Sequence, residues 1–150
     1  MILDEMERNL VSTDTMSAEK AVRLRQHMER FFPEAMVTDF ERLVEAMPND
    51  PKDRHVVAAA VQAGAQVIVT ANLRDFRQLP DGIEAQSPDE FLCNLFDLDP
   101  EGLVVLLREQ AADLRKPPVS FEELLIRLGR IAPELAAAAE VSGRAEDTGD

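Results

Sequence analysis

The apolar residues of the first part of the chain recur every three or four positions in two segments. This spacing predicts one helix over residues 2–11 and a second over residues 18–31. Ser17 is a suitable N-cap for the second helix, and Pro33 is expected to end it.

The middle of the chain alternates between strand-like and helix-like patterns. Short apolar runs predict strands over residues 35–38 and 66–70, and residues 83–86, after a turn, are a candidate for a last, shorter strand. Helical spacing predicts a short helix over 40–47 and a longer one over 53–63. Gly64 follows the longer helix where a left-handed C′ residue is wanted. The run QVIVT at 66–70 is β-branched almost throughout, which is typical of a strand covered on both faces.

From Ser87 onward the pattern predicts helices alone. Ser87 caps a helix rich in Phe and Leu, and further helices are predicted over residues 101–114, 121–128 and 131–141. The fold class is therefore α/β, with a parallel sheet flanked by helices and an all-helical C-terminal extension. The expected boundaries are a domain over 1–97, the extension over 98–141 and a disordered acidic tail over 142–150.

Composition narrows the class of protein. The chain has 150 residues, 45% of them hydrophobic and 30% charged, and a formal net charge of −13. No apolar run approaches the ~20 residues of a membrane span, and Cys93 has no second cysteine to pair with, so we expect a cytoplasmic protein without a membrane partner. The negative charge argues against a general nucleic-acid coat protein but not against an enzyme that holds divalent ions among acids.

Three carboxylates stand where the predicted elements could bring them together: Glu5, Asp53 and Asp75. Hard divalent ions prefer oxygen ligands of this kind. Each acid also has a simpler interpretation: Glu5 on a solvated helix face, Asp53 as a residue favoured at a helix N-terminus, and Asp75 as a turn residue. Spacing does not decide between these interpretations.

The segment from residue 50 to residue 76 resembles the PIN-domain nucleases, in particular the VapC-like toxins. The resemblance rests on the acid that opens a helix in Asp53-Arg54-His55, the Gly-Ala turn, the strand ending in IVT, and the loop TANLRDF. The start ILDEMERNL is similar to the family helix that supplies another acid, and SPDEFL is similar to the usual closing segment. In all, the resemblance covers roughly residues 2–95.

This resemblance implies a metal-dependent endoribonuclease of toxin–antitoxin type, which uses Mg²⁺ or Mn²⁺ and hydrolyses RNA phosphodiesters with metal-activated water. It implies metal-ligating roles for Glu5 and Asp53, and an acid in many members stands where this chain has Asn72, which can ligate through its amide oxygen. Asp75 takes over that role or only sets the loop, and Thr70 orients a ligand or the attacking water. The implied partners are an RNA substrate and a cognate antitoxin.

Basic residues cluster beside these acids. Lys52, Arg54 and Arg74, with Arg77 nearby, are either contacts for RNA phosphates or exposed loop charges without a special role. For His55 we expect a local hydrogen bond in the first helical turn.

The chain departs from the PIN pattern at its start. Its first residues match a later helix of the family, so the opening strand and its metal-ligating Asp have no counterpart. The chain is then a truncated product, a partner of a separate polypeptide, or a degenerate relative. The alternative function is therefore a non-catalytic or split subunit that binds a missing N-terminal half or a second copy and lacks activity alone.

Overall fold

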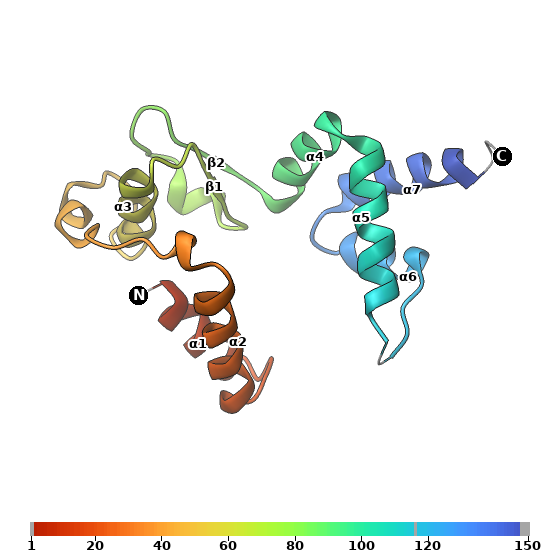
Figure 1. Cartoon of the computed structure of the whole chain (residues 1–150). Helices are drawn as coiled ribbons and strands as arrows, with labels where there is room; N and C mark the ends of the chain where they lie inside the picture. The colour runs from red at the N-terminus through yellow and green to blue at the C-terminus, as the bar shows by residue number, and fades with distance from the viewer. Residues whose placement is uncertain (1, 116, 148–150) are drawn as a thin grey trace. The chain divides into compact units, whose positions relative to one another are not determined.

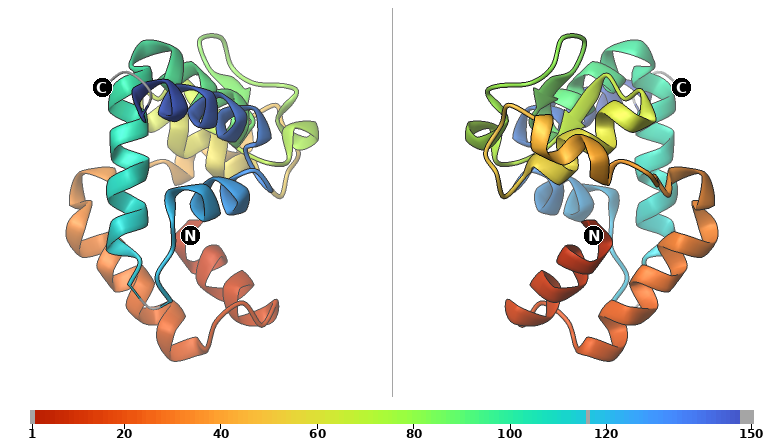
Figure 2. Two further views of the ribbon diagram at one scale, coloured as in Figure 1. Left: turned by 90° about the vertical axis from the view of Figure 1, so that its right-hand side faces the viewer. Right: turned by 90° about the vertical axis from the view of Figure 1, so that its left-hand side faces the viewer.

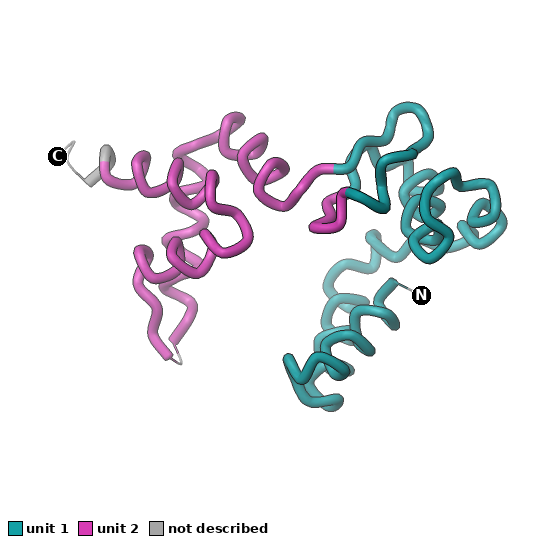
Figure 3. Tube along the Cα trace, turned by 180° about the vertical axis from the view of Figure 1, so that it is seen from behind, with its two compact units in different colours: residues 1–68, 74–85 teal, residues 69–73, 86–150 magenta. Residues whose placement is uncertain are grey.

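The structure, a computed structural model, describes residues 2–115 and 117–147. The chain divides into two compact units (Figures 1 and 3). Unit 1 runs to Ile68 and resumes over Arg74–Ala85, and unit 2 contains Val69–Leu73 and everything from Gln86 onward. Each unit has its own buried core.

Unit 1 begins with a helical hairpin made by α1 (Ile2–Ser12) and α2 (Ala18–Phe31), visible in both views of Figure 2. Both helices agree with the apolar spacing. The Ser17 hydroxyl caps α2 by accepting the Lys20 N–H at 3.4 Å. Arg25 of α2 fastens the hairpin, because its Nη1 lies 2.6 Å from Asp4 Oδ1 on α1.

The strand predicted over residues 35–38 is wrong. Pro33–Ala35 form the 3₁₀ turn η1, in which the Met36 N–H donates to Pro33 O, and extended backbone without a sheet partner follows. Proline suits the first position of such a turn, since the missing N–H is not needed there. The helix predicted over 40–47 forms as the 3₁₀ helix η2 (Glu41–Ala46).

Helix α3 (Arg54–Ala63) carries the core of unit 1. It packs against η2, and its Val57 and Ala58 are completely buried. The small alanine side chains allow this close approach. The buried core consists of Phe40, Met47, Val57, Ala58, Ala59, Ile68 and Phe76.

Gly64 ends α3 in the left-handed conformation, with φ +66°. Replacing it with alanine should lower the free energy of unfolding by roughly 1–2 kcal/mol, because an L side chain is strained there. A new Cβ would meet nothing within 4 Å, so the backbone alone sets this cost. Urea unfolding measures it. Asn tolerates this conformation, so Gly64→Asn should lose less; equal losses would contradict the backbone explanation.

Strands β1 (Val67–Val69) and β2 (Glu84–Gln86) form a small parallel sheet. The Glu84 N–H donates to Gln66 O at 2.9 Å, and the Thr70 N–H donates to Gln86 O at the same distance. Val69 is 45% exposed, so the expectation that this strand is covered on both faces does not hold along its whole length. The 3₁₀ helix η3 (Leu73–Phe76) follows β1 and carries Asp75.

Unit 2 is helical beyond the sheet. Its helices are α4 (Pro88–Leu98), α5 (Pro100–Asp113), α6 (Phe121–Leu128) and α7 (Pro133–Asp147). The Asp89 carboxylate on α4 accepts the N–H groups of Glu134 and Leu135 at 3.1 and 3.0 Å. A carboxylate of one helix therefore caps the start of another. Val104, Leu107, Leu125 and Ala139 form the buried core between them.

The fold is α/β with a helical C-terminal part, but its boundaries differ from those expected. Helix α7 continues to Asp147, so residues 142–147 are helical where the sequence predicted a disordered tail; residues 148–150 lie outside the described residues. Helix α4 belongs to the same compact unit as α5, α6 and α7, whereas the predicted boundary followed residue 97.

Candidate functional site

Asp53 stands at the N-cap of α3, at the end of a tight loop. Its N–H donates to Asp50 O at 3.0 Å, and the Asp50 carboxylate accepts the Lys52 N–H at 3.1 Å. The Asp53 side chain makes no capping hydrogen bond to the helix. Its carboxylate is therefore not used for the local purpose that commonly explains an acid at this position.

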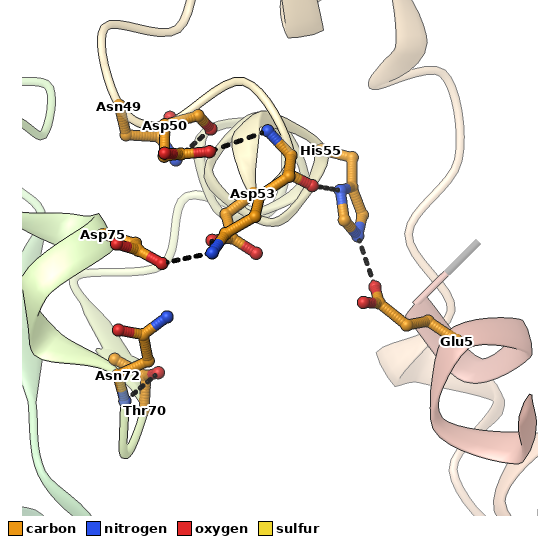
Figure 4. Close-up of polar contacts among 9 residues, drawn as sticks. Glu5, Asn49, Asp50, Asp53, His55, Thr70, Asn72 and Asp75 are labelled. Atoms are coloured by element: carbon orange, nitrogen blue, oxygen red, sulfur yellow. Dashed lines mark hydrogen bonds and ion pairs between the residues drawn. The ribbon is translucent and has the colours of Figure 1, made fainter. Parts of the chain in front are cut away.

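The Lys52 ammonium lies between two carboxylates of unit 1. Its Nζ is 2.6 Å from Asp75 Oδ2 and 3.9 Å from Asp53 Oδ2. Figure 4 labels the two acids. The two carboxylates are mostly shielded from solvent, with side chains 15% and 19% exposed, whereas the lysine side chain is 64% exposed. The loop before α3 and the 3₁₀ helix after β1 thus bring two acids onto one cation.

The negative charge of Asp53 is less well neutralised by the Lys52 ammonium than that of Asp75. Its Oδ2 is buried and accepts no hydrogen bond, since 3.9 Å to the ammonium exceeds a hydrogen-bond distance. Burial raises the pKa of the Asp53 carboxyl above its usual range, the Lys52 charge opposes that rise, and the charges of Asp75, Asp50 and Glu5 add to it. A buried carboxylate oxygen without a donor is a position where a cation would be stabilising.

Glu5 reaches this region from α1 through His55. His55 Nδ1 lies 3.1 Å from Lys52 O, which is the local hydrogen bond predicted for this residue. Because a carbonyl oxygen only accepts, the ring hydrogen is on Nδ1. Nε2 then faces Glu5 Oε2 at 3.3 Å, a contact that counts as an ion pair only for a cationic ring. Glu5 therefore contacts the helix N-terminus and not the Lys52 ammonium.

Thr70 and Asn72 lie in the loop after β1 and belong to unit 2. The Thr70 hydroxyl accepts the Asn72 N–H at 3.1 Å. This bond shapes the turn that leads into η3. Threonine hydroxyls commonly form such local bonds with the main chain in turns.

Three arginines line an open pocket of about 500 Å³ in unit 1, next to Asp75. They are Arg54, Arg74 and Arg77, and none forms an ion pair with another residue that the structure describes. Arg54 Nε donates to Asn49 O, at 3.3 Å. The pocket is also lined by Asp50 and Asp75, and guanidinium groups without an ion pair suit an anion such as phosphate.

Two protein families match this chain, one in each part. The family described as "PIN domain" matches residues 1–74, which include Glu5, Asp53, Thr70 and Asn72, and the family described as "VapC50 C-terminal domain" matches residues 88–140. The chain is 39% identical over 108 residues to the protein named "putative ribonuclease VapC50" of Mycobacterium tuberculosis. This chain belongs to the VapC-like PIN-domain family.

The matches cover only part of this chain and part of its VapC-like relative. The similar region covers 70% of this chain and 64% of the relative, so the chain spans less than two thirds of that protein's length. The PIN match ends one residue before Asp75 and is shorter than the resemblance expected from the sequence. The helical C-terminal part, α4 to α7, corresponds to a family domain of its own. No solved structure matches the chain.

Divalent metal is the cofactor that the PIN family implies, and the site fits it in part. The donors are hard oxygens, and Asp53 offers one that is buried and unsatisfied. Among the residues that the structure describes, no group of three or more His, Cys, Asp or Glu is arranged to hold a metal. Two carboxylates suit Mg²⁺ or Mn²⁺, because such ions keep several waters and bind one or two protein carboxylates.

No helix in the described part of the chain is long and apolar enough to cross a membrane.

Sequence reasoning missed two features of this VapC-like site. Lys52 was expected either as a phosphate contact or as an exposed loop charge, whereas its ammonium is bound to Asp75; nothing in the local sequence indicates which acid a flexible lysine meets. Asn49 is 4% exposed, with its Oδ1 buried and unpaired. The Asn49-Asp50-Pro51 run signals a turn, but not that the first residue is buried.

Proposed function

We propose that this VapC-like chain is a metal-dependent endoribonuclease of toxin–antitoxin type, acting on RNA and controlled by a cognate antitoxin. The observation that carries the proposal is the convergence of Asp53 and Asp75 on one cation, with a buried, unsatisfied oxygen on Asp53. Membership of the PIN family supports the reaction class, and 39% identity to a protein named as a ribonuclease supports the substrate class.

Asp53 and Asp75 would hold Mg²⁺ or Mn²⁺. A bound divalent ion would supply Lewis-acid activation of water and neutralisation of phosphate charge. Glu5 adds negative charge near Asp53, and its carboxylate lies 3.3 Å from His55 Nε2. A ligating amide oxygen on Asn72 stays a prediction, and Thr70 fixes the loop that carries Asn72.

Arg54 and Arg74 would bind RNA phosphates beside the acids, together with Lys52. The two guanidiniums line the pocket that Asp75 borders, so a strand whose phosphate occupies the pocket passes next to the carboxylates. These positive groups matter because the net charge of −13 repels RNA elsewhere on the surface. Phosphate contacts of this kind position a strand without reading its sequence.

The proposed activity is tested by incubating the purified chain with structured RNA and Mn²⁺, and in parallel with EDTA. We expect cleavage with Mn²⁺, none with EDTA, and recovery when excess Mn²⁺ is restored. Cleavage that continues at the same rate in EDTA would refute the metal mechanism, because the acids would then have no ion to hold.

A second candidate function is a non-catalytic or split subunit. The described residues form a sheet of only two strands, Val69 is 45% exposed, and the Asn72 side chain brings no charge to the site. Such a subunit would assemble with a separate polypeptide or with a second copy. Mass measurement together with thermal melting distinguishes the two functions: a monomer that melts cooperatively and cleaves RNA by itself excludes the second.

A further inference from the structure

The main chain of Lys52 is fixed on both sides. Its N–H donates to the Asp50 carboxylate at 3.1 Å, and its carbonyl oxygen lies 3.1 Å from His55 Nδ1. The position from which the side chain starts is therefore set by the loop and by the first turn of α3. The side chain itself is 64% exposed, so it can leave its contacts without disturbing the core.

The Lys52 ammonium occupies the place that suits a cation in this site. It lies against Asp75 Oδ2 and near the buried Asp53 Oδ2, and these two carboxylates are the ones proposed above as metal ligands. The hydrogen bond with Asp75 raises the pKa of Lys52, with further contributions from the charges of Asp75, Asp53 and Asp50, so the group is a permanent cation near neutral pH. Without a positive charge, the two shielded carboxylates would repel each other.

We propose that Lys52 is a built-in counter-ion that holds Asp53 and Asp75 together before metal binds and is displaced from them when a divalent ion enters. The inference rests on the metal site of the proposed function. One consequence is competition, because the ammonium and the metal ion need the same oxygens. Breaking the lysine contact costs free energy, and this cost weakens the affinity for the metal ion. A second consequence is that the ligands are already assembled when the ion arrives.

Lys52→Met tests both consequences, because it keeps an unbranched side chain and removes the charge. With EDTA present, the variant should melt at a lower temperature than the wild type, by roughly 2 °C, since the carboxylates lose their shared cation. In a calorimetric titration with Mn²⁺ alone, it should bind at least about fivefold more tightly, because the competitor is gone.

Two matched variants make the test specific. Lys20→Met removes an exposed lysine from α2 and therefore changes the net charge by the same amount as Lys52→Met. It should leave the Mn²⁺ affinity unchanged, which shows that net charge alone does not alter metal binding. Lys52→Arg retains a cation and should stay within about twofold of the wild type. If the wild type binds Mn²⁺ and Lys52→Met binds no more tightly, the displacement is refuted while the metal site stands. If neither protein binds Mn²⁺, the metal site itself is refuted, and this inference with it.

Discussion

We expect Asp53→Asn to reduce metal-dependent RNA cleavage by about 100-fold or more and at the same time to raise the melting temperature of the metal-free chain. The activity falls because the amide removes the charge of the acid that we propose as the principal metal ligand. The stability rises because the ionised Asp53 carboxylate is buried with an oxygen that accepts no hydrogen bond. Loss of function with a gain in stability separates a ligand from a residue that merely supports the fold.

The stability gain of Asp53→Asn should depend on pH in a defined direction. Burial raises the pKa of Asp53 above 3.8, so the folded chain binds this proton more tightly than the unfolded chain. The free energy of unfolding therefore falls as pH rises from about 3.8 through the raised pKa of Asp53 in the folded chain. Above that pKa, the buried carboxylate is ionised and destabilises the folded chain to its full extent. In EDTA, the melting temperature of Asp53→Asn should exceed that of the wild type near neutral pH, and the two melting temperatures should be equal below pH 3.8.

Asp81→Asn is the matched control for Asp53→Asn. Asp81 lies in an exposed turn of the same unit, so its substitution removes one negative charge without touching the site. We expect its cleavage rate and its melting temperature to stay near those of the wild type. Equal loss of cleavage in both variants would mean that overall charge, and not ligation by Asp53, controls the activity.

Leu135→Ala is expected to have the largest effect on stability, a loss of roughly 2–5 kcal/mol in the free energy of unfolding. Leu135 is 2% exposed on α7, and its N–H donates to Asp89 on α4. Truncation removes buried apolar atoms and leaves a cavity at the position where two helices are joined. Urea unfolding measures this loss.

Leu98→Ala provides the comparison, since Leu98 is 82% exposed at the end of α4. The same change of side chain should there alter stability by less than about 0.5 kcal/mol. Similar losses at Leu98 and Leu135 would contradict the burial on which the described packing of unit 2 depends.

Features set by neighbouring residues could be predicted from the sequence. The hydroxyls of Ser17 and Ser87 each cap a helix by accepting an N–H three residues later, as their positions indicated. The left-handed Gly64 was equally visible. The run at 35–38 misled because three apolar residues and a threonine are too few to show a period, and Pro33 just before them starts a 3₁₀ turn.

The candidate site was less visible in the sequence because its contacts join distant segments. That Asp53 and Asp75 could approach each other followed from the order of helix and strand. That a lysine next to Asp53 would contact Asp75 depends on where η3 is placed, and local pattern does not encode this. Likewise the contact of Glu5 with His55 joins α1 to the first turn of α3, and no local pattern indicates it.

Diffraction from crystals grown with Mn²⁺, recorded where manganese scatters anomalously, tests the central claim most directly. We predict an anomalous peak in contact with the carboxylates of Asp53 and Asp75, with the Lys52 ammonium moved away from both. Crystals with saturating Mn²⁺ in which the ammonium still binds Asp75 and no peak lies between the two acids would contradict the account.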